Sequence, residues 1–241
     1  MKKIISLIAA VLLIIGAICM SGCATYKGEY GDFVCEFFDT KNTVDINGLS
    51  EEGKKKKILV IPEEINGYKV DFIGKKVLTG TGKPDISSKN LEVIYFVNEL
   101  KGRFGQQDCP NLKKAFQIKN TYPNIDIIWE FKLEKNRVYM MSNFFMSNYK
   151  GTEELYAANV SYFYNYADAP NDGYYWLDDL DDGEKITYIP ENPTREGYLF
   201  GGWFKDKACT EVWDFETDTI TKPADDYYEN ILYAKWNKKN D

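Results

Sequence analysis

The stretch "REGYLFGGWFKDKACTEVWDF", Arg195–Phe215, places six aromatic residues around a glycine pair that would permit a β-bulge or a close backbone approach. The rings alternate with other residues within strand-like runs, as side chains do when one face of a strand enters a core. Bulky rings also give a small domain the apolar area that it needs. We therefore predict that these rings and two later ones are mainly core rather than a platform for sugars or peptides: Tyr198, Phe200, Trp203, Phe204, Trp213, Phe215, Tyr233 and Trp236.

The motifs around this stretch occur in a fixed order from Asn159 to Trp236. They are "VSYFYNY", "GEKITYIPENPTREGY", "GGWF", "WDF" and "LYAKW". In this order they resemble the internalin-type B-repeat, also called the Listeria–Bacteroides repeat. The resemblance implies a small β-grasp-like domain, which we place at residues 158–237. After its "NDG" turn, Tyr174, Tyr175 and Trp176 are the rings most expected to be exposed, as an edge strand or as a site.

A different pattern precedes this domain. The segments "LVIPEEINGYKVDFIG" and "LEVIYFVNELKGRFGQQDCPNLKKAFQI" resemble the BspA-like leucine-rich repeat, and Leu91 and Leu112 are 112 − 91 = 21 positions apart. The resemblance implies a short solenoid, which we place at residues 33–157. Because about three repeats are needed for stability, "FVCEFF" and "IDIIWEFKLEKNRVYMM" are expected as caps, the latter a hairpin that turns at Glu134–Arg137. The predicted fold class is thus mainly β or α+β, with the solenoid followed by the B-repeat domain.

The N-terminus has the layout of an export signal, because two lysines precede an apolar run and small residues. Its end, "MSGC", resembles a bacterial lipobox, which implies a signal peptide at residues 1–22 and a lipidated tether at 23–32. Cys23 would carry the diacylglyceryl anchor; the alternatives are an ordinary signal peptide and an uncleaved membrane helix. Three thiols would remain in the mature chain and cannot all pair, so no disulfide framework is implied. Among them, Cys109 is expected to be a small buried hydrophobe rather than a reactive thiol.

Composition and charge exclude several functions. The chain has no histidine, which removes Ser-His-Asp and Cys-His nucleophile pairs and histidine-bound zinc. Its net charge of -7 argues against a nucleic-acid partner. No Gly-rich phosphate loop and no CxxC pair occur, so we predict no catalytic residue, no metal site and no cofactor. The lysine run at 54–57 favours a solvated loop over a membrane contact. The acidic loop 178–184, with Asp178, Asp179, Asp181 and Asp182, likewise favours a solvated loop over weak calcium binding.

These inferences predict a lipid-anchored protein on the outer face of the cytoplasmic membrane of a bacterium. It would not be an enzyme. Its repeat modules would bind an extracellular protein or glycan, or act in adhesion, because the families that they resemble make such contacts. The alternative is a structural spacer or scaffold that holds a partner at the cell surface and has no ligand of its own.

Overall fold

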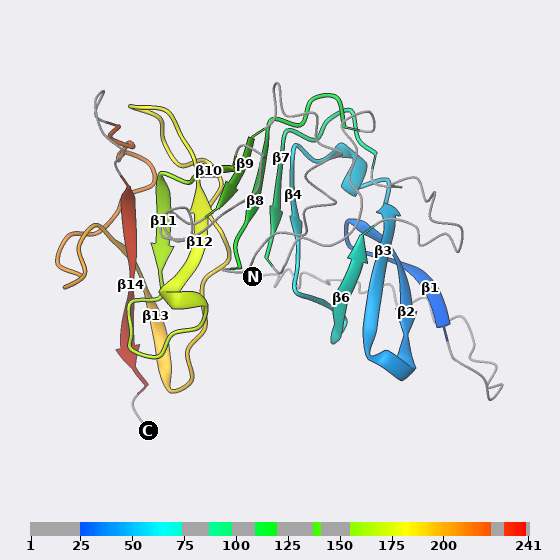
Figure 1. The fold of residues 1–241 in the computed structure, drawn as a ribbon. Helices are drawn as coiled ribbons and strands as arrows, with labels where there is room; N and C mark the ends of the chain where they lie inside the picture. The colour runs from blue at the N-terminus through cyan, green and yellow to red at the C-terminus, as the bar shows by residue number, and fades with distance from the viewer. Residues whose placement is uncertain are drawn as a thin grey trace, which may run out of the picture.

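The computed structural model of the chain is mainly β and describes residues 25–73, 87–97, 109–119, 137–140, 155–222 and 229–239. The predicted signal peptide and Cys23 lie outside these residues. None of the helical segments that the structure describes has the length and apolar character needed to span a bilayer. The described strands form three sheets, and the middle one of these in Figure 1 is parallel.

The first sheet is mixed and has the order β1-β2-β3-β6-β5. Its strands are β1 (Thr25–Tyr30), β2 (Phe33–Phe38), β3 (Thr43–Leu49), β5 (Glu64–Ile65) and β6 (Tyr68–Ile73). A polar turn follows β2 as η1 (Asp39–Lys41), and Asn42 after it is in the left-handed region at φ 51°. Strand β1 pairs antiparallel with β2, so most of the segment that we expected to be a tether is an edge strand.

The second sheet is parallel throughout and has the order β10-β9-β8-β7-β4. Its strands are β4 (Ile58–Ile61), β7 (Val93–Phe96), β8 (Lys114–Gln117), β9 (Arg137–Met140) and β10 (Leu155–Ala157). Val93 pairs with Lys114, an offset of 114 − 93 = 21 that equals the interval read from the sequence. Ile58 pairs with Val93, an offset of 93 − 58 = 35, because the segment between β4 and β7 is longer and includes β5 and β6 of the first sheet.

The prediction of a hairpin turn at Glu134–Arg137 is wrong for Arg137. Arg137 is the first residue of β9, which pairs in parallel with both β8 and β10. Residues 134–136 lie outside the described part of the chain. The polar run "EKNR" resembles a tight turn locally, but pairing with β8 places Arg137 in the ladder instead.

The third sheet has the order β12-β11-β14-β13. Its strands are β11 (Val160–Phe163), β12 (Tyr174–Asp178), β13 (Tyr198–Phe204) and β14 (Asn230–Lys238), with the short turn η3 (Asn171–Gly173) before β12. The first and last of these strands, β11 and β14, run parallel at the centre, and the outer strands pair antiparallel. The expected bulge lies between Phe200 and Trp203, where Gly202 has a φ of 105°.

Strands β4, β7 and β8 of the parallel sheet have side chains packed on both faces, because successive side chains of a strand point to opposite sides. One side-chain set packs against the first sheet in a core that we call the first core; it includes Leu59, Ile61, Ile94, Phe96 and Ala115. The other set packs against the third sheet in a core that we call the shared core; it includes Val60, Tyr95, Phe116 and Ile118 from the parallel sheet and Tyr162, Trp176 and Leu232 from the third sheet. The third sheet is therefore joined to the parallel sheet through a common core.

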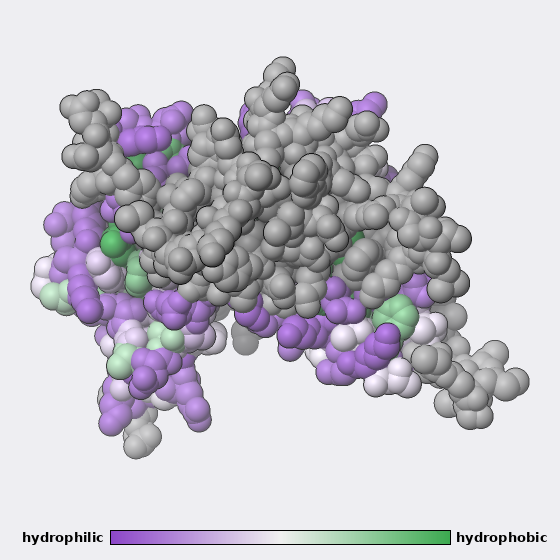
Figure 2. Space-filling view, in the orientation of Figure 1, coloured by the Kyte–Doolittle hydropathy of each residue, from purple (hydrophilic) through white to green (hydrophobic). Residues whose placement is uncertain are grey.

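The aromatic core prediction is right for part of its set. Trp203, Phe204 and Trp213 are buried. The other five members are half-buried: Tyr198, Phe200, Phe215, Tyr233 and Trp236. Among these, Phe200, Phe215 and Trp236 pack against the shared core, as predicted. On β14 the buried residues are Asn230, Leu232 and Ala234. Tyr233 lies between two of them, so its side chain points to the opposite face of the sheet. Where Figure 2 shows described residues, the surface is mostly hydrophilic and its hydrophobic spots are small and separate.

The lysine run contains the short turn η2 (Gly53–Lys55) and is charge-neutralised. Each ammonium group pairs with a carboxylate at 2.6 to 2.8 Å: Lys54 with Glu51, Lys55 with Glu52, Lys56 with Asp32, and Lys57 with Glu92. The side chains are exposed, as a solvated loop requires. This pairing reduces the positive charge that the run presents to an anionic membrane surface, with Glu92 shared between Lys57 and Lys113.

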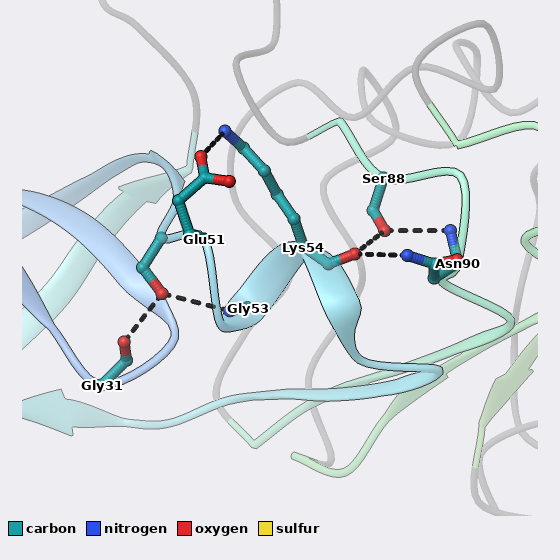
Figure 3. Close-up of polar contacts among 7 residues, drawn as sticks. Gly31, Glu51, Gly53, Lys54, Ser88 and Asn90 are labelled. Atoms are coloured by element: carbon teal, nitrogen blue, oxygen red, sulfur yellow. Dashed lines mark hydrogen bonds and ion pairs between the residues drawn. The ribbon is translucent and has the colours of Figure 1, made fainter.

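A hydrogen-bonded hub joins this lysine turn to two other segments (Figure 3). Ser50 Oγ donates to the Gly31 carbonyl at 2.9 Å and accepts from the Gly53 amide at 3.1 Å. The Lys54 carbonyl accepts bonds of 2.9 Å from Ser88 Oγ and from Asn90 Nδ2. The hub therefore fixes the position of residues 88–90, just before β7 enters the parallel sheet.

Gly53 allows this hub to close, and its substitution gives a test. A Cβ at Gly53 would lie 2.1 Å from the Asp32 carbonyl oxygen, which is backbone and can move little. We expect Gly53→Ala to lower the free energy of unfolding by roughly 2–3 kcal/mol in urea denaturation. The control is Gly31→Ala, where the space is open but φ is +57°, for which we expect a loss of about 1 kcal/mol. Equal losses in the two variants would contradict the steric explanation.

Candidate functional site

A groove of about 690 Å³ lies where the parallel sheet meets the third sheet. One wall comes from the ends of β4, β7 and β8, and the other from β12, the η3 turn and the loop after β12. We call it the junction groove; its lining residues include Val60, Pro62, Glu63, Val97, Ile118, Lys119, Tyr164, Asn171, Asp172, Tyr175, Trp176, Tyr188 and Glu191. Its volume is within the range that small-molecule sites occupy.

Aromatic rings form most of one wall. The Trp176 ring centroid lies 5.9 Å from that of Tyr188 and 6.4 Å from that of Tyr175, and Tyr175 lies 5.1 Å from Tyr164. The expectation that Tyr174 and Trp176 are exposed is wrong, since each is only 5% exposed. Tyr175 is half-buried, because it alternates with them on β12. The wall thus consists of rings that are partly accessible and backed by a buried indole.

Hydrogen bonds hold the two walls in position. Tyr175 Oη donates to the Glu191 carbonyl at 2.5 Å, which fixes that ring against the loop after β12. Asn171 Nδ2 donates to the Ile118 carbonyl at 2.8 Å and to the Tyr174 carbonyl at 3.0 Å. Asn171 therefore ties the η3 turn to the end of β8, and so one wall to the other. A groove held in this way is preformed for a ligand.

The charged groups of the groove are mostly carboxylates. Glu63, Asp172 and Glu191 line it together with a single described cation, Lys119, whose Nζ is 3.7 Å from Glu63 Oε1. This pair is exposed and long, so it stabilises the fold little. Burial raises the pKa of each half-buried tyrosine in the wall, and a nearby carboxylate adds to the effect: Glu63 at Tyr164, and Glu191 at Tyr175 and Tyr188.

Below the groove, the shared core contains a buried carboxyl group. Asp178 ends β12, is 7% exposed and accepts a 2.8 Å bond from the Asp179 amide. Burial raises its pKa to about 6, although the Asp179 amide, Lys114 and the Tyr95 hydroxyl favour the charged form. The Tyr95 ring stacks on Phe116 at 4.8 Å and contacts Trp176 at 4.7 Å. A polar contact between Asp178 and Tyr95 thus lies within the interface between the two sheets.

The acidic loop 178–184 is only partly the solvated loop that we predicted. Asp178 and Asp179 are buried, and Lys114 Nζ donates to the Asp179 carbonyl. Asp181 and Asp182 are exposed, and Asp182 accepts a 2.8 Å bond from the Lys222 amide. Within the described residues, no three Asp, Glu or Cys side chains gather to hold a metal ion. Cys109 is fully buried in the first core, as a small hydrophobe would be.

A second aromatic cluster lies next to the groove and already holds a cation. The Arg195 guanidinium lies 3.8 Å from the ring centroid of Tyr198 and 4.3 Å from that of Tyr166, with Trp236 at 5.9 Å. Tyr166 is 5.8 Å from Tyr164 of the groove wall. Sequence reasoning did not predict this cluster or the groove, since both join segments that are far apart in the chain. The one local signal was the "NDG" turn before β12.

Comparison with known proteins identifies one region of the chain. Residues 160–235 match the Listeria-Bacteroides repeat domain family, which confirms the resemblance found in the sequence. The chain is 27% identical over 145 residues to an Evansella cellulosilytica protein whose name describes a Gly-rich membrane protein, covering 58% of this chain and 15% of that protein. It is 26% identical over 166 residues to internalin H of Listeria monocytogenes, covering 66% and 27%. The chain spans less than a third of the length of these curated relatives.

The buried carboxyl group predicts a pH-dependent stability. Because the folded pKa of Asp178 is raised from 3.8 to about 6, folding favours its protonated form. The stability that protonation provides is full below about pH 4 and is lost as the pH rises through about 6. We compare the free energy of unfolding of Asp178→Asn with that of the unsubstituted protein. We expect this difference to change by roughly 3 kcal/mol in favour of the variant when the pH is raised from 4 to 7.5.

The measurement is urea denaturation of both proteins at the two pH values. Asp181→Asn, an exposed carboxylate in the same loop, is the matched control. A gain that is the same at pH 4 and pH 7.5 would show that packing rather than ionisation governs this position.

Proposed function

We propose that the protein is an exported, lipid-anchored surface protein of a bacterium that binds an extracellular ligand in the junction groove. The observation that carries this proposal is the preformed aromatic wall, in which Tyr164, Tyr175 and Tyr188 are half-buried and Tyr175 is held by a hydrogen bond to the Glu191 carbonyl. Rings fixed in a partly accessible position lose little conformational entropy when a ligand covers them. Binding or adhesion is the role that best fits such a wall.

The fold proposal is that the parallel sheet is a short leucine-rich-repeat solenoid and that the third sheet is a β-grasp-like domain. The offset of 21 residues between β7 and β8 supports the first part. The order β12-β11-β14-β13, with a parallel central pair, supports the second. Both kinds of module are contact folds in the families that they resemble, which is an argument by analogy.

The envelope location rests on the sequence and on names of relatives. The "MSGC" motif supports diacylglyceryl attachment at Cys23, which supplies the two chains that stable anchoring needs. Two relatives from Evansella cellulosilytica have names that describe membrane proteins. The second is 52% identical over 48 residues, covering 20% of this chain and 6% of that protein.

A binding role is favoured over catalysis by the groove's chemistry. Its described walls offer rings, backbone carbonyls and separate carboxylates, and the chain has no histidine to serve as a base. We propose that the protein uses no cofactor. We also propose no nucleic-acid partner, because the net charge of the chain is -7. The spacer alternative is favoured by the mostly hydrophilic surface in Figure 2, which shows no broad hydrophobic patch among its described residues.

The test of the binding role is a screen of the chain from residue 24 onward against immobilised glycans, peptidoglycan and matrix proteins. Deleting a module is unsuitable, because it would expose the shared core. We instead expect Tyr188→Ala to weaken binding about tenfold, since an aromatic contact of 1–2 kcal/mol is lost. The matched control is Tyr26→Ala on β1, in the sheet on the far side of the parallel sheet. Absence of saturable binding from a folded sample would support the spacer role.

The anchor has its own test. We expect Cys23→Ser to abolish processing at residue 23 and incorporation of labelled fatty acid, because the thiol is the acceptor for the lipid. Cys19→Ser, within the predicted signal peptide, is the control and should be processed and labelled normally. The measurement is fatty-acid labelling and membrane fractionation in a bacterial host. Unchanged labelling and fractionation of Cys23→Ser would rule out this anchor.

A further inference from the structure

We propose that the junction groove recognises an organic cation, namely the alkylammonium head of its ligand. This proposal rests on the binding role proposed above and adds the chemical class of the group that is bound. The shared chemistry has two sources, a quaternary ammonium group or the primary ammonium group of a lysine side chain. Three independent features of the described residues support it.

The first feature is the spacing of the rings. A cation is attracted to the face of Tyr or Trp when it lies within about 6 Å of the ring centroid. Of the half-buried rings in the wall, Tyr164 and Tyr175 are 5.1 Å apart, whereas Trp176 between Tyr175 and Tyr188 is buried. One head group placed along this wall can therefore contact two rings at once. The backing by the buried shared core also lowers the local dielectric, which strengthens such contacts.

The second feature is the balance of charge. Among the described residues of the lining, carboxylates (Glu63, Asp172 and Glu191) outnumber ammonium groups (Lys119). The fields of Glu63 and Glu191 reach the tyrosine hydroxyl groups, since both carboxylates contribute to raising the pKa of those tyrosines. A cation entering the groove would be stabilised by both the rings and these carboxylates. An anion would be repelled by them.

The third feature is a cation that the fold itself holds on the same kind of surface. The Arg195 guanidinium lies over the rings of Tyr166 and Tyr198, and Tyr166 adjoins Tyr164 of the groove wall. The aromatic surface is thus continuous from the Arg195 cluster into the groove. At the cluster, the chain supplies the cation; at the groove, the rings have carboxylates around them and no described cation over their faces.

The experiment titrates four probes into the chain from residue 24 onward and follows the NMR signal of the Trp176 indole N–H, assigned with Trp176→Phe. The probes are choline, its neutral isostere dimethylbutanol, N-acetyl-lysine methylamide and the neutral sugar chitotriose. We expect choline or the lysine amide to bind about tenfold more tightly than dimethylbutanol, because the two choline-shaped probes differ in charge. Either order of the two cations retains the proposal and identifies the source of the ammonium group.

Charge variants give the second arm. We expect Glu63→Gln and Glu191→Gln each to weaken cation binding about threefold, and Lys119→Met to strengthen it about threefold, since all three groups are exposed or half-buried. Glu29→Gln on β1 is the matched control and should change nothing. These substitutions are on the surface and keep side-chain size, so loss of folding does not confuse the result.

Equal binding of choline and dimethylbutanol, or no response of cation binding to the three charge variants, would overturn the proposal. Binding of chitotriose alone would also overturn it, yet would leave the binding role of the groove intact. By contrast, a screened ligand whose affinity is unaffected by Tyr188→Ala would remove the groove from the proposed function itself. The two failures are therefore distinguishable.

Discussion

The fold depends on the alternation of side chains along three short parallel strands. In β4, β7 and β8, one set of side chains enters the first core and the other enters the shared core. A shift of one residue in the pairing would exchange these sets and place Tyr95 where Phe96 belongs. Strands buried on both faces need apolar residues at successive positions, which explains the runs "ILVI" and "VIYF". The two neighbouring sheets are held together through this one layer.

The local patterns of the sequence predicted the elements better than the way they assemble. The 21-residue interval between Leu91 and Leu112 gave the spacing of β7 and β8, and the ordered motifs gave the B-repeat region. Nothing local indicated that the Tyr95 ring would contact the Trp176 ring, because that contact joins residues 81 positions apart, 176 − 95 = 81. The groove was missed for the same reason. The apolar residues at successive positions of β4 and β7 are the one local signal that a layer covers each face of these strands.

The interface between the sheets combines packing with a few polar contacts that set its geometry. Asp178 is costly to bury, as its raised pKa shows, but it is paired with the Asp179 amide and lies near Lys114. Asn171 bonds two carbonyl groups, one on each side of the interface. Polar groups in such positions favour one arrangement of two apolar surfaces over sliding alternatives. The ring positions in the groove wall depend on this arrangement, because Trp176 belongs both to the wall and to the shared core.

The parallel pairing of β11 with β14 has a mechanical consequence. These strands lie side by side and run in the same direction, so the start of β11 and the end of β14 are at opposite ends of the pair. Tension applied through residues 159 and 239 would draw the two strands past each other lengthwise. All the ladder hydrogen bonds between them would then resist together, instead of opening one after another as in a hairpin pulled from its open end. This region would extend only at high force, and the shared core would transmit that force directly to the parallel sheet.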